Sequence, residues 1–141
     1  MDTKVKAFIK KWHGRILEDD GCYVSKEYNS FQNAFKRIMA TIAESLDAEL
    51  VDYHKGHYDM SGFIKRGDKY VYFSYSSSLS GPRSQVLLKH RCMFDSGCVS
   101  PMLFRTAADD KDFRGGMNNF HAFEGCEELI ENLLNQEHKR F

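Results

Sequence analysis

Several features that would assign a class are absent from this sequence. Its 20 Lys and Arg are balanced by 20 Asp and Glu, so the formal net charge is zero. This balance argues against a strongly basic nucleic-acid binder and against an acidic mimic of DNA. No apolar run approaches the roughly 18 residues that span a bilayer, and the opening MDTKVKAFIKKW lacks the long apolar segment of a secretory signal. We therefore expect a cytoplasmic protein without a membrane partner.

Motifs that hold a metal or mark a common enzyme are also missing. Cysteine occurs four times without any C-x2-C spacing, at Cys22, Cys92, Cys98 and Cys126. Free thiols are the simplest interpretation in a reducing compartment, but the sequence leaves pairing or metal binding by these residues open. Neither G-x-S-x-G nor H-E-x-x-H occurs. On this basis we assign no metal, no cofactor and no catalytic residue, and an enzyme is the less favoured class.

Hydrophobic periodicity predicts two or three helices. Apolar residues at helical spacing predict an amphipathic helix over residues 3–18 and a second helix from Asn29 or Ser30 to about Asp47. A third helix is expected over residues 124–138, with glutamates in its first half, where they suit the helix dipole. The stretch 4–15 carries only positive charges, whereas acids gather over 109–137, so we expect a dipolar molecule.

A change to strand-like patterns begins at about residue 50. Residues 58–65 and 70–75 are expected to form a hairpin, because aromatic and β-branched residues flank the turn sequence Arg66-Gly67-Asp68-Lys69. Shorter strands are expected at 50–53, 86–88 and 101–105, and an exposed loop at 76–84. The chain of 141 residues is expected to form one domain, 1–141. The predicted class is α+β, with a single antiparallel sheet of four or five strands packed against two or three helices.

The segment from Arg105 to Phe120, RTAADDKDFRGGMNNF, is the most unusual part of the chain. Ordering each of its backbone units costs about 1–2 kcal/mol, and it has few apolar side chains to bury in return. Its acids offset its bases, which disfavours a phosphate cradle. We expect Phe113 and Phe120 to hold the segment while its charges face a protein partner. The expected partner-binding residues are Arg105, Asp109, Asp110, Lys111, Asp112, Phe113 and Arg114.

Two other functions are compatible with the sequence. His54 and His57 could act as general acid and base, which would suit a small metal-independent ribonuclease. Alternatively, Phe63, Tyr70 and Tyr72 could stack on the bases of single-stranded nucleic acid while nearby lysines hold phosphates. Cleavage of labelled RNA would identify the first function. Salt-sensitive retention on a single-stranded DNA column would identify the second.

A resemblance to known proteins is carried by the hairpin GHYDMSGFIKRGDKYVYFSYS, by the following LFRTAADDKDFRGGMNNF and by the closing acidic helix. These segments, about residues 56–134, resemble small uncharacterised proteins of plasmids, phages and integrative elements of Gram-positive bacteria. Such mobile elements carry anti-defence inhibitors, including anti-CRISPR proteins, so the resemblance implies a stoichiometric binder. The expected function is therefore a non-enzymatic interaction protein that inhibits a bacterial defence nuclease by occluding a nucleic-acid or partner surface. Its expected partner is a protein, for example a nucleoprotein nuclease complex, and direct nucleic-acid binding is the less favoured alternative.

Overall fold

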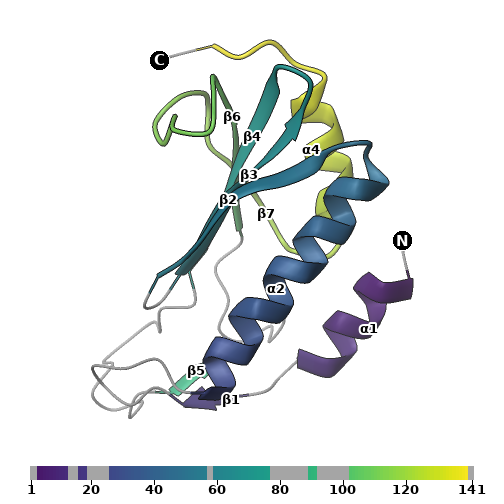
Figure 1. Cartoon of the computed structure of the whole chain (residues 1–141), viewed down its shortest axis with the longest axis vertical. Coiled ribbons are helices and arrows are strands. Elements are labelled where there is room, and N and C mark those ends of the chain that lie inside the picture. Colours follow the sequence, from purple (N-terminus) through teal and green to yellow (C-terminus); the bar gives the residue numbers. More distant parts are fainter. Residues whose placement is uncertain are drawn as a thin grey trace.

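The structure is a computed structural model that describes residues 3–12, 16–18, 26–56, 59–76, 89–91 and 102–139. At 16–18, 26–28, 76 and 89–91 only the backbone is described. Within these ranges, three helices accompany one antiparallel sheet of five strands, as Figure 1 shows. The predicted α+β class is therefore confirmed.

The five-stranded sheet has the order β2-β3-β4-β6-β7, so β2 and β7 are its edges. Its strands are β2 (Glu49–Lys55), β3 (Asp59–Arg66), β4 (Lys69–Ser76), β6 (Met102–Ala107) and β7 (Asn119–His121). The predicted hairpin corresponds to β3 and β4, and Gly67 in its turn has φ 63°, a conformation that favours glycine. The sequence did not predict β7, which has only 3 residues and begins inside the polar segment.

The helices gather on one side of the sheet, which we call the inner face (Figure 1). They are α1 (Thr3–Trp12), α2 (Lys26–Ser45) and α4 (Cys126–Leu134). The long helix α2 runs across the sheet, and α1 lies alongside α2. Helix α2 ends where Asp47 adopts φ 54° and the N–H of Ala48 donates to the carbonyl of Ala43 at 2.9 Å. This arrangement satisfies the last helical carbonyls, as in a Schellman motif.

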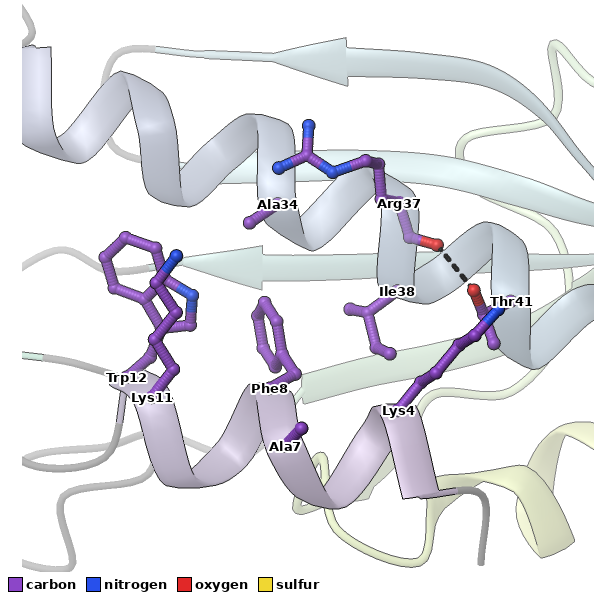
Figure 2. Close-up of a pocket in the computed structure, with 9 residues that line it drawn as sticks. All are labelled: Lys4, Ala7, Phe8, Lys11, Trp12, Ala34, Arg37, Ile38 and Thr41. Atoms are coloured by element: carbon purple, nitrogen blue, oxygen red, sulfur yellow. Dashed lines mark hydrogen bonds between the residues drawn. The ribbon is translucent and has the colours of Figure 1, made fainter.

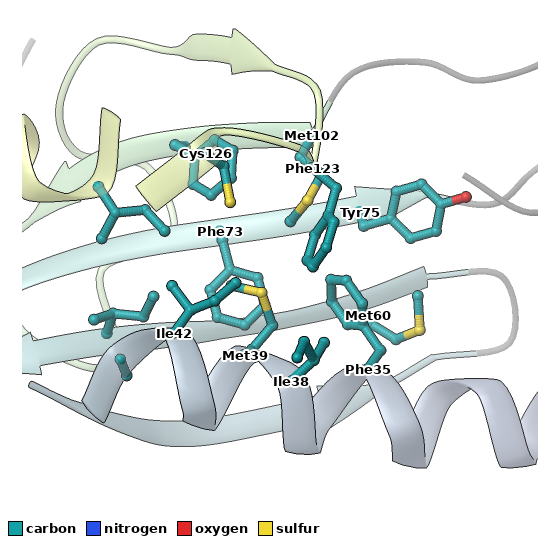
Figure 3. Close-up of a cluster of buried hydrophobic side chains, with 14 of the residues drawn as sticks. Phe35, Ile38, Met39, Ile42, Met60, Phe73, Tyr75, Met102, Phe123 and Cys126 are labelled. Carbon is teal, nitrogen blue, oxygen red and sulfur yellow. The ribbon is translucent and has the colours of Figure 1, made fainter. Parts of the chain in front are cut away.

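An aromatic core joins the helices to the inner face (Figure 3). The Phe35 ring of α2 lies 6.3 Å from the Phe73 ring of β4 and 6.0 Å from the ring of Phe123, which precedes α4. Full burial of such a side chain contributes about 1.5–3 kcal/mol. The apolar stripe of α2 therefore decides which face of the sheet the helices cover.

Two predicted helices are longer than the observed ones. Helix α1 ends at Trp12, and residues Ile16–Glu18 form a short strand, β1. This strand pairs with β5 (Lys89–Arg91) in a separate two-stranded antiparallel sheet. The sequence could not reveal this pairing, because it joins segments that are far apart along the chain. Helix α4 begins only after Gly125, whose φ of 82° interrupts the helical backbone, and it ends at Leu134.

The remaining sequence predictions fall partly on residues that the structure does not describe. The expected strand at 86–88 lies outside the described ranges, as does the expected loop apart from residue 76. The expected strand at 101–105 corresponds to β6, which extends to Ala107. The first residues of the polar segment, Arg105 and Thr106, are therefore part of the sheet.

Candidate functional site

The surface predicted from the sequence lies on the side of the sheet away from α2 and α4, which we call the outer face. Strand register aligns Phe63, Tyr72 and Arg105 in one row across β3, β4 and β6. Phe63 is 1% exposed, and the guanidinium Cζ of Arg105 lies 4.4 Å from the centre of the Tyr72 ring. Such a cation–π contact contributes about 0.5–2 kcal/mol. The row gives the outer face an aromatic and cationic floor.

Residues 108–118, which we call the strap, follow β6 and lie over this floor (Figure 1). The Phe113 ring lies 5.7 Å from the Phe63 ring and 5.9 Å from the Tyr72 ring, and it meets Tyr72 edge to face. Each aromatic pair contributes about 0.5–1.5 kcal/mol beyond simple burial. Phe113 therefore anchors the strap to the sheet, as the sequence led us to expect, whereas Phe120, which was expected to hold the segment as well, is 64% exposed on β7.

The tip of the strap reaches the edge strand β2. There Asp110 approaches Asp52, which lies at a bulge of β2 and has φ 49°. A side-chain hydrogen bond with Asp110, together with the negative charge of that residue, raises the pKa of Asp52. The positive charge of Lys111 acts in the opposite direction. Two carboxyl groups therefore meet at the tip, and they repel each other when both are ionised.

Asp112 fixes the base of the strap. Its Oδ2 accepts a hydrogen bond from the N–H of Ala108 at 2.9 Å, and its Oδ1 accepts one from the N–H of Arg114 at 3.4 Å. Oδ2 also lies 3.1 Å from Nε2 of His138, which follows α4. On the other side of that imidazole, Nδ1 lies 3.1 Å from Oγ1 of Thr106. A carboxylate, an imidazole and a hydroxyl thus connect the strap, the segment after α4 and strand β6.

Two glycines allow this close packing. A Cβ at Gly115 would lie 2.1 Å from Oδ2 of Asp112. Gly116 has φ 76°, and a Cβ there would lie 2.5 Å from the backbone oxygen of Thr106. A larger residue at Gly116 would push the strap away from β6, and one at Gly115 would disturb the contact of Asp112 with His138. The two glycines are therefore required by close packing within the protein, rather than by an approach to phosphate.

The strap is held in place, yet several of its side chains face solvent. Phe113 is 57% exposed, Met117 is 66% exposed, and Phe120 on the edge strand β7 is 64% exposed. Within the part of the chain that the structure describes, these are the only large apolar side chains that are exposed. Exposed charged residues of the same strap are Asp109, Lys111 and Arg114.

The structure divides the seven predicted partner-binding residues into two groups. Arg105 and Asp112 are 8% and 6% exposed; Arg105 lies in the sheet beneath the strap, and Asp112 fixes the strap from within. Nη1 of Arg105 also donates to Oδ1 of Asn118 at 3.4 Å. The residues of the second group are accessible at the surface; they are Asp109, Asp110, Lys111, Phe113 and Arg114. The role of these residues in binding stays a prediction.

The alternative ribonuclease site is only partly described. His54 is exposed on β2, opposite Ser61 in the register, and His57 lies outside the described residues. His54 pairs with Ser61 in the register, so its side chain lies on the outer face.

The thiols and the other potential metal ligands give no metal site in the described ranges. Cys126 is buried in the core, and this burial raises the pKa of its thiol, so it remains protonated and packs as an apolar residue. Cys22, Cys92 and Cys98 lie outside the described residues. Among the residues that are described, no group of three or more His, Cys, Asp or Glu side chains is arranged to hold a metal ion.

Sequence reasoning missed three contacts around the strap, which involve Asp52, Asn118 and His138. Each of these residues contacts a residue of the predicted segment in the folded chain. Asp52 and His138 are far in sequence from the strap residues that they contact. No rule of residue spacing connects a strand bulge or a residue beyond α4 with the strap. The glycine pair was the available signal, because adjacent glycines indicate a close backbone approach.

No protein-family model, curated protein or solved structure matches this chain. In the ranges that the structure covers, no helix has both the length and the apolar character needed to cross a membrane. The geometry of the strap and the pattern of the sequence are therefore the basis for inferring function.

Proposed function

We propose that this protein is a non-enzymatic interaction protein that binds a protein partner through the strap and β7. In this proposal it acts as a stoichiometric inhibitor of a bacterial defence nuclease by occluding a functional surface of that nuclease. The observation that carries the proposal is the location of the exposed Phe113, Met117 and Phe120 within one short stretch. The resemblance to proteins of mobile genetic elements directs the proposal to a defence nuclease.

Preorganisation of the strap supports a role in recognition. Phe113 anchors its middle on the sheet, and Asp112 fixes its base through two backbone hydrogen bonds. A loop that is ordered before binding loses less conformational entropy when the partner docks. A solvated connector between β6 and β7 would not need these anchors.

The mixture of side chains favours a protein over a nucleic acid. Asp109 and Asp110 repel phosphates, whereas exposed aromatic and thioether side chains beside charged residues resemble the centre and rim of a protein interface. The ring of Tyr72, which could otherwise stack on a base, is already in contact with Arg105 and Phe113. These contacts count against the single-stranded nucleic-acid alternative.

The test uses the double variant Met117→Ser/Phe120→Ser. Both side chains are more than half exposed, so their removal should leave folding intact while binding weakens at least about tenfold. The tagged wild-type protein and the variant are incubated with lysate of a Gram-positive host, and retained proteins are quantified. The retained nuclease is then purified, and its cleavage activity is titrated with wild-type protein, with inhibition expected to saturate at one inhibitor per complex.

A matched control is Lys36→Ser/Glu44→Ser, which removes two exposed side chains of α2 without changing the net charge. It should retain the same partner as the wild type. If both double variants retained every captured protein equally, Met117 and Phe120 would not be part of the binding surface. If a partner were captured but its nuclease activity were unaffected, the proposed interaction would stand and the proposed inhibition would be wrong.

A second candidate function, ester or amide hydrolysis, is favoured by the contact of Thr106, His138 and Asp112. The order hydroxyl, imidazole, carboxylate is that of a nucleophile, its base and the group that orients the base. Thr106 also borders two cavities of about 170 and 530 Å³. In this reaction Oγ1 bonds to the carbonyl carbon while His138 takes the hydroxyl proton, the leaving group departs with that proton, and water then hydrolyses the acyl-threonine.

Thr106→Val tests this second candidate, because valine keeps the shape of threonine and removes only the hydroxyl. Hydrolysis of p-nitrophenyl esters by the wild type should fall to the background rate in the variant. Equal rates for wild type, Thr106→Val and buffer would leave the three residues as a purely structural connection.

A further inference from the structure

A groove of about 280 Å³ lies between α1 and α2, on the helical side of the molecule and away from the strap (Figure 2). Its floor includes Phe8, Trp12 and Ile38. The floor packs on the aromatic core, because the Phe8 ring lies 5.5 Å from that of Phe123 and the Trp12 ring lies 5.1 Å from that of Phe31. The groove is therefore formed by the helix packing itself.

The charges around this groove have one sign. Lys4 and Lys11 come from α1, and Arg37 comes from α2. No acidic side chain is found among the described residues that line the groove. Nζ of Lys11 lies 5.3 Å from the centre of the Trp12 ring, so this ammonium group stays at the edge of the apolar floor. An occupant must therefore combine apolar groups with negative charge.

Burial of the floor distinguishes between two anionic occupants, a nucleic acid and an acidic protein segment. Phe8 is 8% and Trp12 is 3% exposed, so neither ring has a free face on which a nucleic-acid base could stack. Narrow apolar side chains can instead contact Ala7 and Ala34, which also line the groove and are more accessible. An amphipathic helix presents such side chains one turn apart, with carboxylates on either side of them.

We propose that the groove between α1 and α2 binds an acidic amphipathic segment of a protein partner. Apolar side chains of the segment lie over Ala7 and Ala34, and its carboxylates pair with Lys11 and Arg37. This surface is separate from the strap, since the strap covers the outer face and the groove lies among the helices. The proposal therefore does not depend on what the strap binds.

The direct test measures binding of a fluorescent synthetic helix that has leucines at i and i+4 on one face and glutamates on its flanks. The comparison probes are the same helix with every glutamate replaced by glutamine and a single-stranded DNA oligonucleotide. The acidic helix should bind at least about tenfold more tightly than the glutamine helix, and added salt should narrow this difference. Absence of binding by the acidic helix, or tighter binding of the DNA, would overturn the proposal.

Two charge-reversal variants locate the binding. Lys11→Glu/Arg37→Glu changes the rim of the groove, and Lys10→Glu/Lys36→Glu makes the same charge change at neighbouring exposed residues that do not line it. The first variant should lose about tenfold or more in affinity, and the second should stay much closer to wild type. An equal loss in both would indicate a diffuse charge effect and reject the groove as the site.

Further controls keep the result interpretable. Circular dichroism shows whether Lys11→Glu/Arg37→Glu folds. If it does not, two neutral pairs replace the charge reversals, Lys11→Gln/Arg37→Gln at the rim and Lys10→Gln/Lys36→Gln beside it. The rim pair should again bind the acidic helix more weakly than the neighbouring pair. Met117→Ser/Phe120→Ser should bind the acidic helix like the wild type, so failure of the strap and failure of the groove can be told apart. Sedimentation that shows a dimer broken by the rim variant would assign the groove to a second copy and overturn the proposal.

Discussion

The two faces of the sheet are covered in different ways. On the inner face, α2 and its neighbours bury Phe35, Phe73 and Phe104 completely, each at 0% exposure. On the outer face, the strap lies on Phe63 and Tyr72, and its anchor Phe113 remains 57% exposed. The inner face therefore provides most of the apolar burial. The outer face keeps apolar side chains in fixed positions where a partner can reach them.

The same substitution on both faces is the strongest test of this contrast. Phe73→Ala should lower the free energy of unfolding by about 3–5 kcal/mol, because it leaves a cavity in a closely packed core. Phe113→Ala should lower it by only about 1–2 kcal/mol, since the ring is half in solvent and loses mainly its two aromatic contacts. Urea unfolding followed by circular dichroism measures both values. Similar losses for the two variants would show that the strap is part of the core.

Glycine substitutions test the fit of the strap against β6. Gly67 and Gly116 both have positive φ, 63° and 76°, so alanine should cost about 1–2 kcal/mol of backbone strain at each. A Cβ at Gly67 meets nothing within 4 Å, whereas one at Gly116 would meet the backbone oxygen of Thr106. Gly116→Ala should therefore destabilise the protein by about 1–3 kcal/mol more than Gly67→Ala in urea unfolding. Equal losses would mean that the strap does not need this close approach.

The inner face could be predicted from sequence because its signals are local. The apolar stripe of α2 and the alternation in β3 and β4 each follow from spacing within one segment. The elements that sequence reasoning missed depend on contacts between distant segments. Strand β1 forms only by pairing with β5, and β7 is a strand of 3 residues that needs β6 as a template.

The candidate site shows the same limit at the level of single residues. Composition identified the polar segment and the anchoring role of Phe113, because an aromatic residue in a charged loop must find a partner. It could not show that Arg105 and Asp112 are buried or that His138 contacts both Asp112 and Thr106. These roles depend on how the strap folds back over the sheet, and no residue spacing along the chain encodes that path.

The smallest expected effect concerns the tip of the strap on the outer face, where the carboxyl groups of Asp52 and Asp110 lie close together. The pKa of Asp52 in the folded protein lies above its ordinary value of 3.8, because Asp110 shares a hydrogen bond with it and carries like charge. Protonation of Asp52 therefore stabilises the folded state, fully so below pH 3.8, and this stabilisation is lost as the pH rises through the folded-state pKa.

At neutral pH, Asp52→Asn should raise the melting temperature slightly, since asparagine tolerates the positive φ and cannot repel Asp110. The difference from wild type should shrink as the pH falls toward the ordinary value and as salt is added. Asp68→Asn, in the exposed β3–β4 turn, is the control, because it makes the same substitution away from the strap. An Asp52→Asn protein that is less stable than wild type at neutral pH would mean that the two carboxyl groups attract the strap to β2 rather than strain it.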